Sequence, residues 1–388
     1  MDRKDIKPEL SLDERDRRWS LVRERLKREG LAAIIIYGNK QHHVPLRYLS
    51  NTAITGATQE VMLFPAEGAP IVLVSAPLAP ARNKQNPFRW VENMYYSVDW
   101  AADLAKKIIE IRLEKERIGM DSFKTWPVRE YRILRGLCPD IELSEASMVL
   151  SKIRGPKSRE EIRLMEEAIR IAELAQRAFL SNLRPGLQEQ AVVGKVEDVV
   201  RANGVDQRLW LIASDPENTS ADLPGTTIIQ RPNPVAFSSE FARTRGYSAQ
   251  VVRTYCWDEP KGEYKRMWEL WKEFRMMVPK ELRPGRATHE LGAKIVDMAH
   301  KWGFECDYLG HAIGLYVADD PYISSSPKMQ RYQEWTIMPN EVYVFHPMIT
   351  AKDRKPPLAW IADMYLVGED GTKWMTPFLP GLPEMIPT

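Results

Sequence analysis

The chain has 388 residues, of which 44% are hydrophobic and 28% charged. This length allows two domains with separate cores, and 55 basic against 53 acidic residues give no electrostatic reason to expect nucleic acid or membrane as a partner. No apolar run approaches the roughly 20 residues that span a bilayer. The charged start MDRKDIKPEL does not resemble a signal peptide, and three cysteines without paired spacing favour a reducing cytoplasm.

The first 150 residues are predicted to form an α/β domain. Ser11 is typical of a helix N-cap, and Gly30 is typical of the end of the same helix. The apolar run 31–37 then predicts a buried strand. Further strands are predicted at 60–64 and 70–75, and a helix at 101–112. This alternation is typical of an α/β fold.

The stretch 38–51, GNKQHHVPLRYLSN, lies between two predicted strands and contains His42 and His43. Adjacent residues cannot share a face of a helix or strand, so the two rings point in different directions. Two interpretations remain open for this stretch. It is either a solvated loop or a loop that reaches an active site.

The polar stretch 151–157, SKIRGPK, contains a Gly-Pro pair and predicts a boundary between domains 1–150 and 151–388. Ser158 follows, with Glu161 three residues later, which is the pattern of a capping box. We therefore expect the second domain to begin with a long amphipathic helix.

The second domain contains an internal repeat. The sequence Leu-Arg-Pro-Gly occurs at 183–186 and again at 282–285, an offset of 99 positions. Three more identities keep this offset: Lys195 with Lys294, Asp198 with Asp297 and Gly204 with Gly303. The repeat predicts a duplicated α+β unit whose halves are related by a pseudo-twofold axis, with a ligand cleft between them.

Strands are predicted in this domain at 208–213, 234–237, 246–255, 341–345 and 360–366, with a hairpin turn at 368–371. His311 lies between two glycines in Gly-His-Ala-Ile-Gly. A single histidine in apolar surroundings is either a satisfied core residue or a functional one, and this motif alone does not decide between them.

Four motifs together carry a family resemblance: Gly-His-Ala-Ile-Gly-Leu at 310–315, Gly246-Tyr247 with 253–255, Met-Pro-Asn-Glu-Val at 338–342, and Ile-Ala-Asp at 361–363. In order and spacing they resemble the creatinase, prolidase and methionine aminopeptidase superfamily. The resemblance implies a pita-bread C-terminal domain, of class α+β, after a creatinase-like α/β N-terminal domain. It extends to the helix after Ser158 and to Arg47-Tyr48-Leu49.

The resemblance also implies where metal ligands belong. Metallopeptidases of this superfamily hold two metal ions with Asp, Asp, His, Glu and Glu, and the corresponding positions here are Ser239, Gln250, His311, His346 and Ala362. Only the histidine is kept, whereas a dinuclear site needs bridging carboxylates. We therefore expect no metal and no other cofactor. A single zinc or copper ion on His311, His346 and Asp222 is a weaker alternative.

The chain thus resembles creatinase, the metal-free branch, yet Asp222 stands at the position of its base histidine, and both carboxylates that grip a cation are missing. We expect a metal-independent hydrolase or lyase for a small polar molecule, with His311 or His346 as the acid/base and Asp222 as partner. The expected substrate-binding residues are Gln250, Ser239, Glu240, Arg253 and Asp363.

Two other functions remain open: a non-catalytic binding or regulatory protein on a retired peptidase scaffold, and an Xaa-Pro dipeptidase-like metallopeptidase. The resemblance further implies a homodimer in which the N-terminal domain of one subunit closes the other's cleft. In that assembly His42, His43 and Arg47 would contribute to substrate binding.

Overall fold

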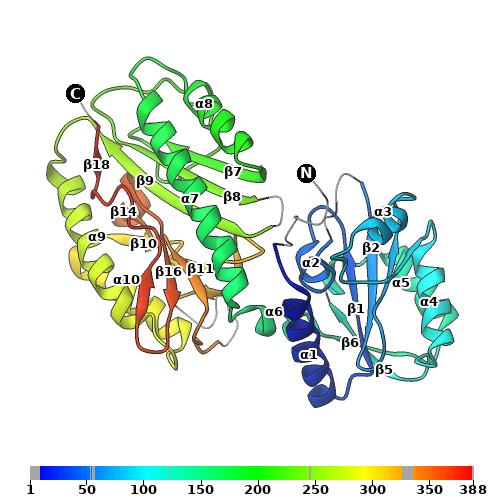
Figure 1. The fold of residues 1–388 in the computed structure, drawn as a ribbon. Coiled ribbons are helices and arrows are strands. Elements are labelled where there is room, and N and C mark those ends of the chain that lie inside the picture. Colours follow the sequence, from blue (N-terminus) through cyan, green and yellow to red (C-terminus); the bar gives the residue numbers. More distant parts are fainter. Residues whose placement is uncertain are drawn as a thin grey trace. The chain divides into compact units, whose positions relative to one another are not determined.

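The computed structural model describes residues 9–52, 54, 57–121, 123–243, 246–325 and 335–386. Most of the N-terminal decapeptide MDRKDIKPEL therefore lies outside the described residues. The chain divides into two compact units, Met1–Arg154 and Gly155–Thr388 (Figure 1). The boundary predicted after residue 150 falls inside helix α6 (Ser147–Arg154), which completes the first unit. Within the described residues, no helix is long and apolar enough to cross a membrane.

The first unit is built on a six-stranded sheet with the order β4-β3-β2-β1-β5-β6. Its strands are β1 (Ala33–Gly38), β2 (Glu60–Pro65), β3 (Ile71–Val74), β4 (Asn93–Tyr96), β5 (Arg117–Asp121) and β6 (Glu142–Glu145). Its other helices are α1 (Leu12–Glu29), α2 (Val44–Ser50), α3 (Ala79–Gln85), α4 (Trp100–Glu110) and α5 (Val128–Leu137), with a 3-10 turn at Phe123–Thr125. Every residue of β1, β2 and β3 is buried, and apart from Glu60 at the start of β2 their sequences are apolar.

Helix α1 begins and ends where its sequence predicts. The Ser11 hydroxyl accepts a hydrogen bond from the Glu14 backbone N–H at 3.0 Å, and Gly30 closes the helix with a left-handed φ of 63°.

The interpretation of residues 38–51 as one continuous loop is wrong in its second half. Residues Val44–Ser50 form helix α2, with His43 at the N-cap, and all seven helical residues are buried. Pro45 in the first turn is pre-organised for a helix, and apolar side chains then secure it against the sheet. Seven residues carry too little periodicity to be recognised from the sequence.

The second unit has two halves. Helices α7 (Arg159–Asn182) and α8 (Glu189–Ala202) belong to the first half, and α9 (Gly262–Glu281) and α10 (Thr288–Trp302) to the second. The first half contains a sheet of order β18-β9-β8-β7, made of β7 (Val205–Ala213), β8 (Val235–Arg243), β9 (Ser248–Cys256) and β18 (Glu384–Met385).

The second half contains two sheets, of order β12-β11-β13-β16-β17 and β10-β14-β15. Their strands are β10 (Glu305–Asp307), β11 (Gly310–Ala312), β12 (Asp319–Ile323), β13 (Val342–Phe345), β14 (Met348–Ala351), β15 (Lys355–Trp360), β16 (Asp363–Val367) and β17 (Thr372–Trp374), with a 3-10 turn at Lys352–Arg354. The predicted turn at 368–371 is present, because the Gly368 N–H donates to the Gly371 carbonyl at 2.8 Å.

The two copies of the sequence repeat occupy equivalent places. The first joins α7 to α8, and the second joins α9 to α10 (Figure 1). Gly186 and Gly285 have nearly identical φ values of 86° and 85°, a left-handed conformation that glycine adopts without strain. The sequence identity at the turn therefore reflects a shared backbone requirement.

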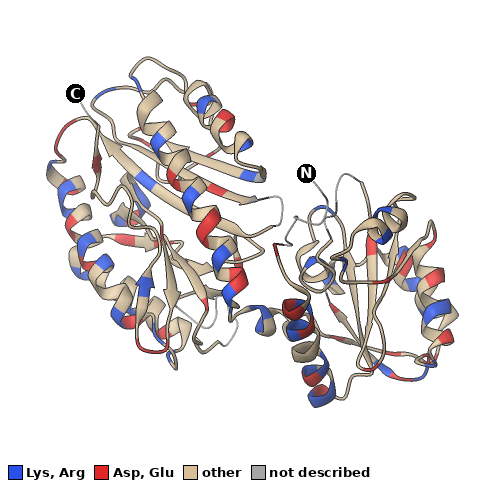
Figure 2. Cartoon of the chain, in the orientation of Figure 1, with Lys and Arg blue, Asp and Glu red and all other residues tan. Residues whose placement is uncertain are grey.

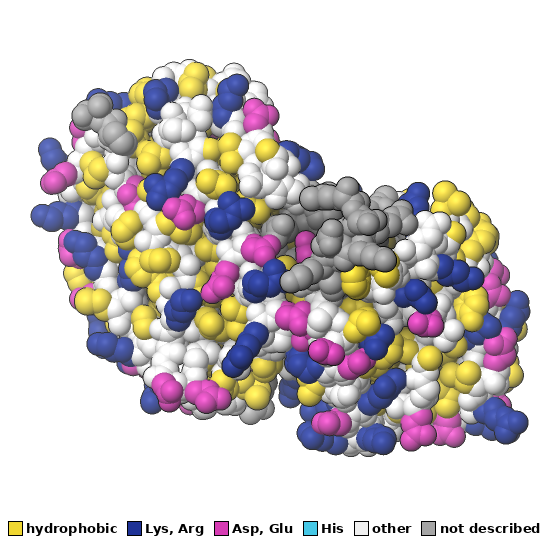
Figure 3. All heavy atoms as spheres, in the orientation of Figure 1, with side chains coloured by type: hydrophobic (Ala, Val, Ile, Leu, Met, Phe, Trp, Pro, Cys, Tyr) yellow, Lys and Arg dark blue, Asp and Glu magenta, His cyan; other side chains and the backbone are white. Residues whose placement is uncertain are grey.

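Helices cover one face of the sheets in both halves. Phe179 of α7 stacks on Phe237 of β8 at a ring distance of 4.0 Å, and Phe274 of α9 packs edge-on against Phe345 of β13. Charged residues are concentrated on the helices, whereas the strands carry few (Figure 2). On the face shown in Figure 3, basic and acidic side chains are interspersed over both units.

Candidate active site

Strand pairing defines which side chains share the face that the helices leave uncovered. Strand β9 is joined to the second half by a bridge between Val252 and Ala362, and the ladder of β13 and β16 pairs Phe345 with Asp363. One residue further in the same register, His346 lies opposite Ala362. Because paired residues share a face and neighbours alternate, Gln250 of β9, Ala362 and His346 point to the side away from the helices.

His311 lies on the same face. It pairs with Val344 of β13, two residues before His346, and the two imidazole rings are 4.9 Å apart at an interplanar angle of 65°. Nδ1 of His311 is 2.9 Å from the Ala312 carbonyl oxygen. A carbonyl can only accept, so this bond assigns the proton to Nδ1, and in the neutral ring Nε2 carries a lone pair.

His346 is buried without a hydrogen bond to its ring. Both Nδ1 and Nε2 lack a partner among the described residues, although the backbone N–H donates to Leu309 at 3.1 Å. Burial, followed by the neighbouring His311, lowers the pKa of His346 to about 3. At neutral pH this imidazole is therefore uncharged and offers one donor and one acceptor.

Glu240 is a third titratable group on this face, after His311 and His346. It lies opposite Gln250 in the β8–β9 ladder, and its carboxyl accepts from the Ser238 hydroxyl at 2.9 Å and from the Gln250 side chain. Burial raises the pKa of Glu240 to about 7, although both hydrogen bonds favour the charged form. Oε1 of Gln250 is buried and has no partner among the described residues.

Ser239 does not share this face. It alternates with Glu240 along β8, and its hydroxyl contacts Gln176 of α7 at 3.0 Å and donates to the Val251 carbonyl at 3.2 Å. The family motif assigns Ser239 to the first ligand position and Gln250 to the second, but in the β8–β9 ladder Glu240, and not Ser239, lies opposite Gln250. A difference of one residue moves a side chain to the other face, which sequence counting across a hairpin does not detect.

Arg253 and Asp363 also lie on the helix side, which corrects their expected role in substrate binding. Arg253 is fully buried, pairs with Asp363 at 3.1 Å and donates to the carbonyls of Thr376, Phe378 and Ala362. Burial alone would raise the pKa of Asp363, but Arg253 and Arg275 together hold it below its usual value. These bonds make Arg253 a structural centre of the second unit.

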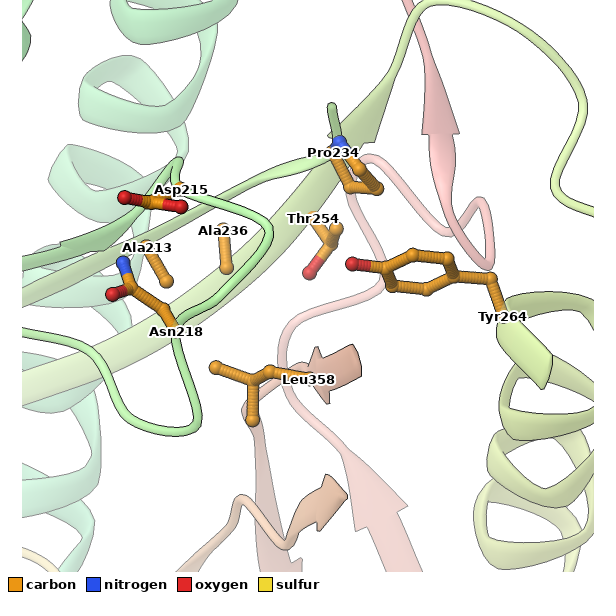
Figure 4. A pocket seen from close by; sticks show the side chains of 8 residues that line it. All are labelled: Ala213, Asp215, Asn218, Pro234, Ala236, Thr254, Tyr264 and Leu358. Atoms are coloured by element: carbon orange, nitrogen blue, oxygen red, sulfur yellow. The ribbon is translucent and has the colours of Figure 1, made fainter. Parts of the chain in front are cut away.

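Asp222 is exposed, and its carboxylate accepts a hydrogen bond from the Leu223 backbone N–H at 2.7 Å. The loop before it, with Asp215 and Asn218, borders a small pocket of about 10 Å³, enough for roughly one water molecule (Figure 4). Tyr264 of α9 extends toward Thr254 of β9 across this pocket. No described contact joins Asp222 to either imidazole, so its role as their partner stays a prediction.

The three residues predicted from the first unit are placed within that unit. His42 is half-buried, and its backbone N–H donates to the Asn39 side chain. His43 is buried with Nδ1 3.0 Å from the Lys40 carbonyl, and burial, followed by Arg47, lowers its pKa. Arg47 donates to the Thr52 carbonyl at 3.2 Å. Their contribution to a neighbouring subunit's cleft stays a prediction.

The donor set does not fit a dinuclear metal centre. The candidate ligands that the described residues place on this face are the Glu240 carboxyl, the Gln250 amide and the two imidazoles, and the Ala362 side chain has no ligand atom. Among the described residues, no three His, Cys, Asp or Glu side chains lie close enough together to hold a metal ion. Two divalent ions need several bridging carboxylates to balance their charge, whereas Glu240 is the one carboxyl that the described strand pairing places beside Gln250 on this face.

Comparison with known proteins places both units. Residues 163–369 match Metallopeptidase family M24, and residues 18–155 match the Creatinase/Prolidase N-terminal domain. Creatinase from Bacillus sp. (strain B-0618) is 22% identical over 96% of this chain and 93% of its own length. Xaa-Pro dipeptidase from Pyrococcus furiosus is 26% identical over 61% of this chain and 67% of its own.

Other matches are partial or structural. The uncharacterized peptidase YqhT from Bacillus subtilis is 27% identical, and the match spans 50% of this chain and about half (56%) of that relative. The solved X-Pro aminopeptidase from Thermotoga maritima superposes with a TM-score of 0.79 at 19% identity, covering 95% of this chain and 98% of that one. These similarities confirm the predicted fold class, a pita-bread domain after a creatinase-like domain. The chain belongs to Metallopeptidase family M24 and carries the N-terminal domain of creatinases and prolidases.

Proposed function

We propose that this protein is a metal-independent hydrolase that cleaves a C–N bond in a small, uncharged polar molecule, with Glu240 as its proton donor. Membership of a family that includes proteins named creatinase and Xaa-Pro dipeptidase supports hydrolysis. The observation that carries the proposal is the pairing of a protonatable Glu240 with Gln250 on the sheet face that also holds two imidazoles.

The unpartnered atoms favour a neutral amide as the substrate class. Oε1 of Gln250 is a buried acceptor, and the ring of His346 adds one donor and one acceptor. Buried polar atoms without partners are costly, and a ligand with an N–H and a carbonyl would satisfy them. Regular sheet spacing puts the Cα atoms of Gln250 and His346 about 12 Å apart, a span suited to a small molecule.

On this face, the part of the chain that the structure describes provides no carboxylate that is fully ionised at neutral pH, which a cationic substrate would need. A guanidinium is best held by ionised carboxylates. Here the Gln250 amide and the His346 ring are both uncharged at neutral pH, and Glu240 is partly protonated. The protein is therefore expected to prefer amides, lactams or ureides to creatine-like cations.

The proposed reaction uses Glu240 and His311 as a matched pair. Nε2 of His311 takes a proton from water as the water oxygen bonds to the carbonyl carbon. Protonated Glu240 then gives its proton to the substrate nitrogen as the C–N bond breaks. For an amide the products are a carboxylic acid and an amine. The proton gained by His311 balances the one lost by Glu240, so the pair is restored by one proton transfer.

The test is turnover of matched substrates by protein that has been dialysed against a chelator. Neutral amides, lactams and ureides are compared with guanidinium compounds, and amine release is measured. Glu240→Gln should lower turnover by about 10²–10⁴-fold, whereas Glu263→Gln, on the exposed face of α9, should not.

Each other outcome supports a different function. Activity that is lost on chelation and restored by a metal ion identifies a metallopeptidase of the Xaa-Pro dipeptidase type. Binding of these compounds without turnover identifies a retired scaffold with a binding role. An unsaturated product in place of an acid and an amine identifies a lyase. The homodimer and the cytoplasmic location remain proposals, which sedimentation and cell fractionation would test.

A further inference from the structure

The first unit contains a pocket of about 510 Å³ that the proposed reaction does not use. Its volume lies in the range of small-molecule sites in proteins, roughly 300–1,000 Å³. We propose that this pocket is a separate binding site for a free α-amino acid with an apolar side chain. The pocket combines a buried carboxyl, an exposed guanidinium and an apolar wall, contributed by Glu60, Arg82 and the segment Pro77–Leu78 with Met94.

Glu60 of β2 supplies the acidic end of the pocket. Its side chain is nearly fully buried, with 5% of the residue exposed, yet it contributes to the pocket wall. Oε2 accepts a hydrogen bond from the Thr52 hydroxyl at 3.1 Å. This bond orients the carboxyl, which lines the pocket and can accept hydrogen bonds from an ammonium group.

The opposite charge and the apolar wall come from α3 and the residues before it. Arg82 is exposed on α3 and lines the pocket, and its planar guanidinium suits a carboxylate. Leu78 is 61% exposed, although it is a large apolar residue beside this hollow. A bound apolar side chain would cover it.

The two charges together select a zwitterion. A simple cation at Glu60 would leave Arg82 without a partner in the ligand, and a simple anion at Arg82 would face the Glu60 carboxylate. An α-amino acid carries both charges in one molecule and so offers a partner to each of the two residues. Its side chain then lies against Leu78 and Met94.

The electrostatics of Glu60 supply a second readout. Burial raises the pKa of Glu60 to about 7, against the hydrogen bond from Thr52 and the positive charge of Arg47. Two further titratable or charged groups lie in this region. They are Arg82 on the pocket wall and His43, which interacts with Arg47. Because an ammonium binds the ionised carboxylate, affinity should fall about tenfold per pH unit below 7.

The experiment is isothermal titration calorimetry of L-leucine into the full-length protein at pH 8. N-acetylleucine, which lacks the ammonium, and 3-methylbutylamine, which lacks the carboxylate but keeps its ammonium at pH 8, serve as matched probes. Leucine should bind, and each analogue should bind at least about tenfold more weakly, as expected for loss of one charged hydrogen bond. Glu60→Gln and Arg82→Ala should each weaken leucine binding to a similar extent.

Control variants separate this site from the proposed active site. Glu67→Gln and Arg132→Ala, both exposed in the first unit, and His311→Ala in the second unit should leave leucine binding unchanged. Glu60→Gln should also remove the pH dependence. The proposal is overturned if wild-type protein gives no heat with millimolar leucine, or if Arg82→Ala, an exposed position that folding tolerates, binds leucine as tightly as wild type. Leucine binding lost only in His311→Ala would place the amino acid at the active site instead.

Discussion

Replacing Arg253 by Met tests whether this residue stabilises the second unit or binds substrate. Its guanidinium pairs with Asp363 at 3.1 Å and donates to four backbone carbonyls, those of Val252, Ala362, Thr376 and Phe378. Met fills a similar volume but provides no donor. The variant therefore leaves several buried acceptors without a partner.

The expected loss of stability is large. Breaking one side of a buried ion pair typically costs about 3–5 kcal/mol, because the remaining charge is left buried. Arg275 still pairs with Asp363 at 2.9 Å, so we expect the lower end, about 3 kcal/mol. For a unit of this size that corresponds to a fall of roughly 6–12 °C in its melting temperature.

Differential scanning calorimetry of the full chain measures this shift. Arg275→Met is the matched control, because that side chain is 15% exposed and contacts one carbonyl besides Asp363, so it should cost less. A loss of about 1 kcal/mol would lower the melting temperature of a unit of this size by about 2–4 °C. A melting temperature for Arg253→Met within about 2 °C of wild type would therefore refute the structural role of Arg253. A raised KM with unchanged stability would instead favour a role for Arg253 in substrate binding.

Three further predictions concern single side chains. For Glu240 as proton donor, the rate should fall as pH rises through about 7, since the protonated form is lost, and this dependence should be absent from Glu240→Gln in a pH–rate profile. Ser239→Ala should lower the unfolding free energy by about 1 kcal/mol in chemical denaturation and leave kcat unchanged, because its hydroxyl bonds on the helix side. Gly292→Ala should destabilise the protein by about 1–3 kcal/mol, since an added Cβ overlaps the Ser324 backbone, whereas Gly194→Ala meets nothing within 4 Å and should not destabilise.

The sequence predicted the architecture because its signals are local or periodic. The capping box at Ser158 is present, with the Glu161 side chain accepting from the Ser158 N–H at 2.9 Å. The Leu-Arg-Pro-Gly sequence is repeated because the turn in each half needs a glycine with a left-handed backbone. Such features depend on a few neighbouring residues, and they survive in sequence at low overall identity.

The residues that form the site were harder to predict from the sequence, because the direction of a side chain depends on the register of its strand. Ser239 and Glu240 are adjacent, and only the pairing of β8 with β9 shows that Glu240 shares the face of Gln250. Arg253 is also polar and was expected to bind substrate. It follows Val252, which faces away from the helices, so Arg253 points toward them. The raised pKa of Glu240 and the lowered pKa of His346 follow from burial, which the sequence does not contain.

The protonation state of Glu240 tests the proposed chemistry most directly, because it requires no knowledge of the substrate. Carbon-13 NMR of protein labelled at the glutamate carboxyls measures the titration midpoint of each carboxyl group. The spectra are recorded from pH 4 to pH 9, a range of about 2–3 units around the expected value. We predict a carboxyl resonance with a midpoint near pH 7 that is absent from Glu240→Gln and retained in Glu60→Gln. If the resonance lost in Glu240→Gln instead titrates near the ordinary value of 4.5, Glu240 is ionised at neutral pH and cannot be the proton donor.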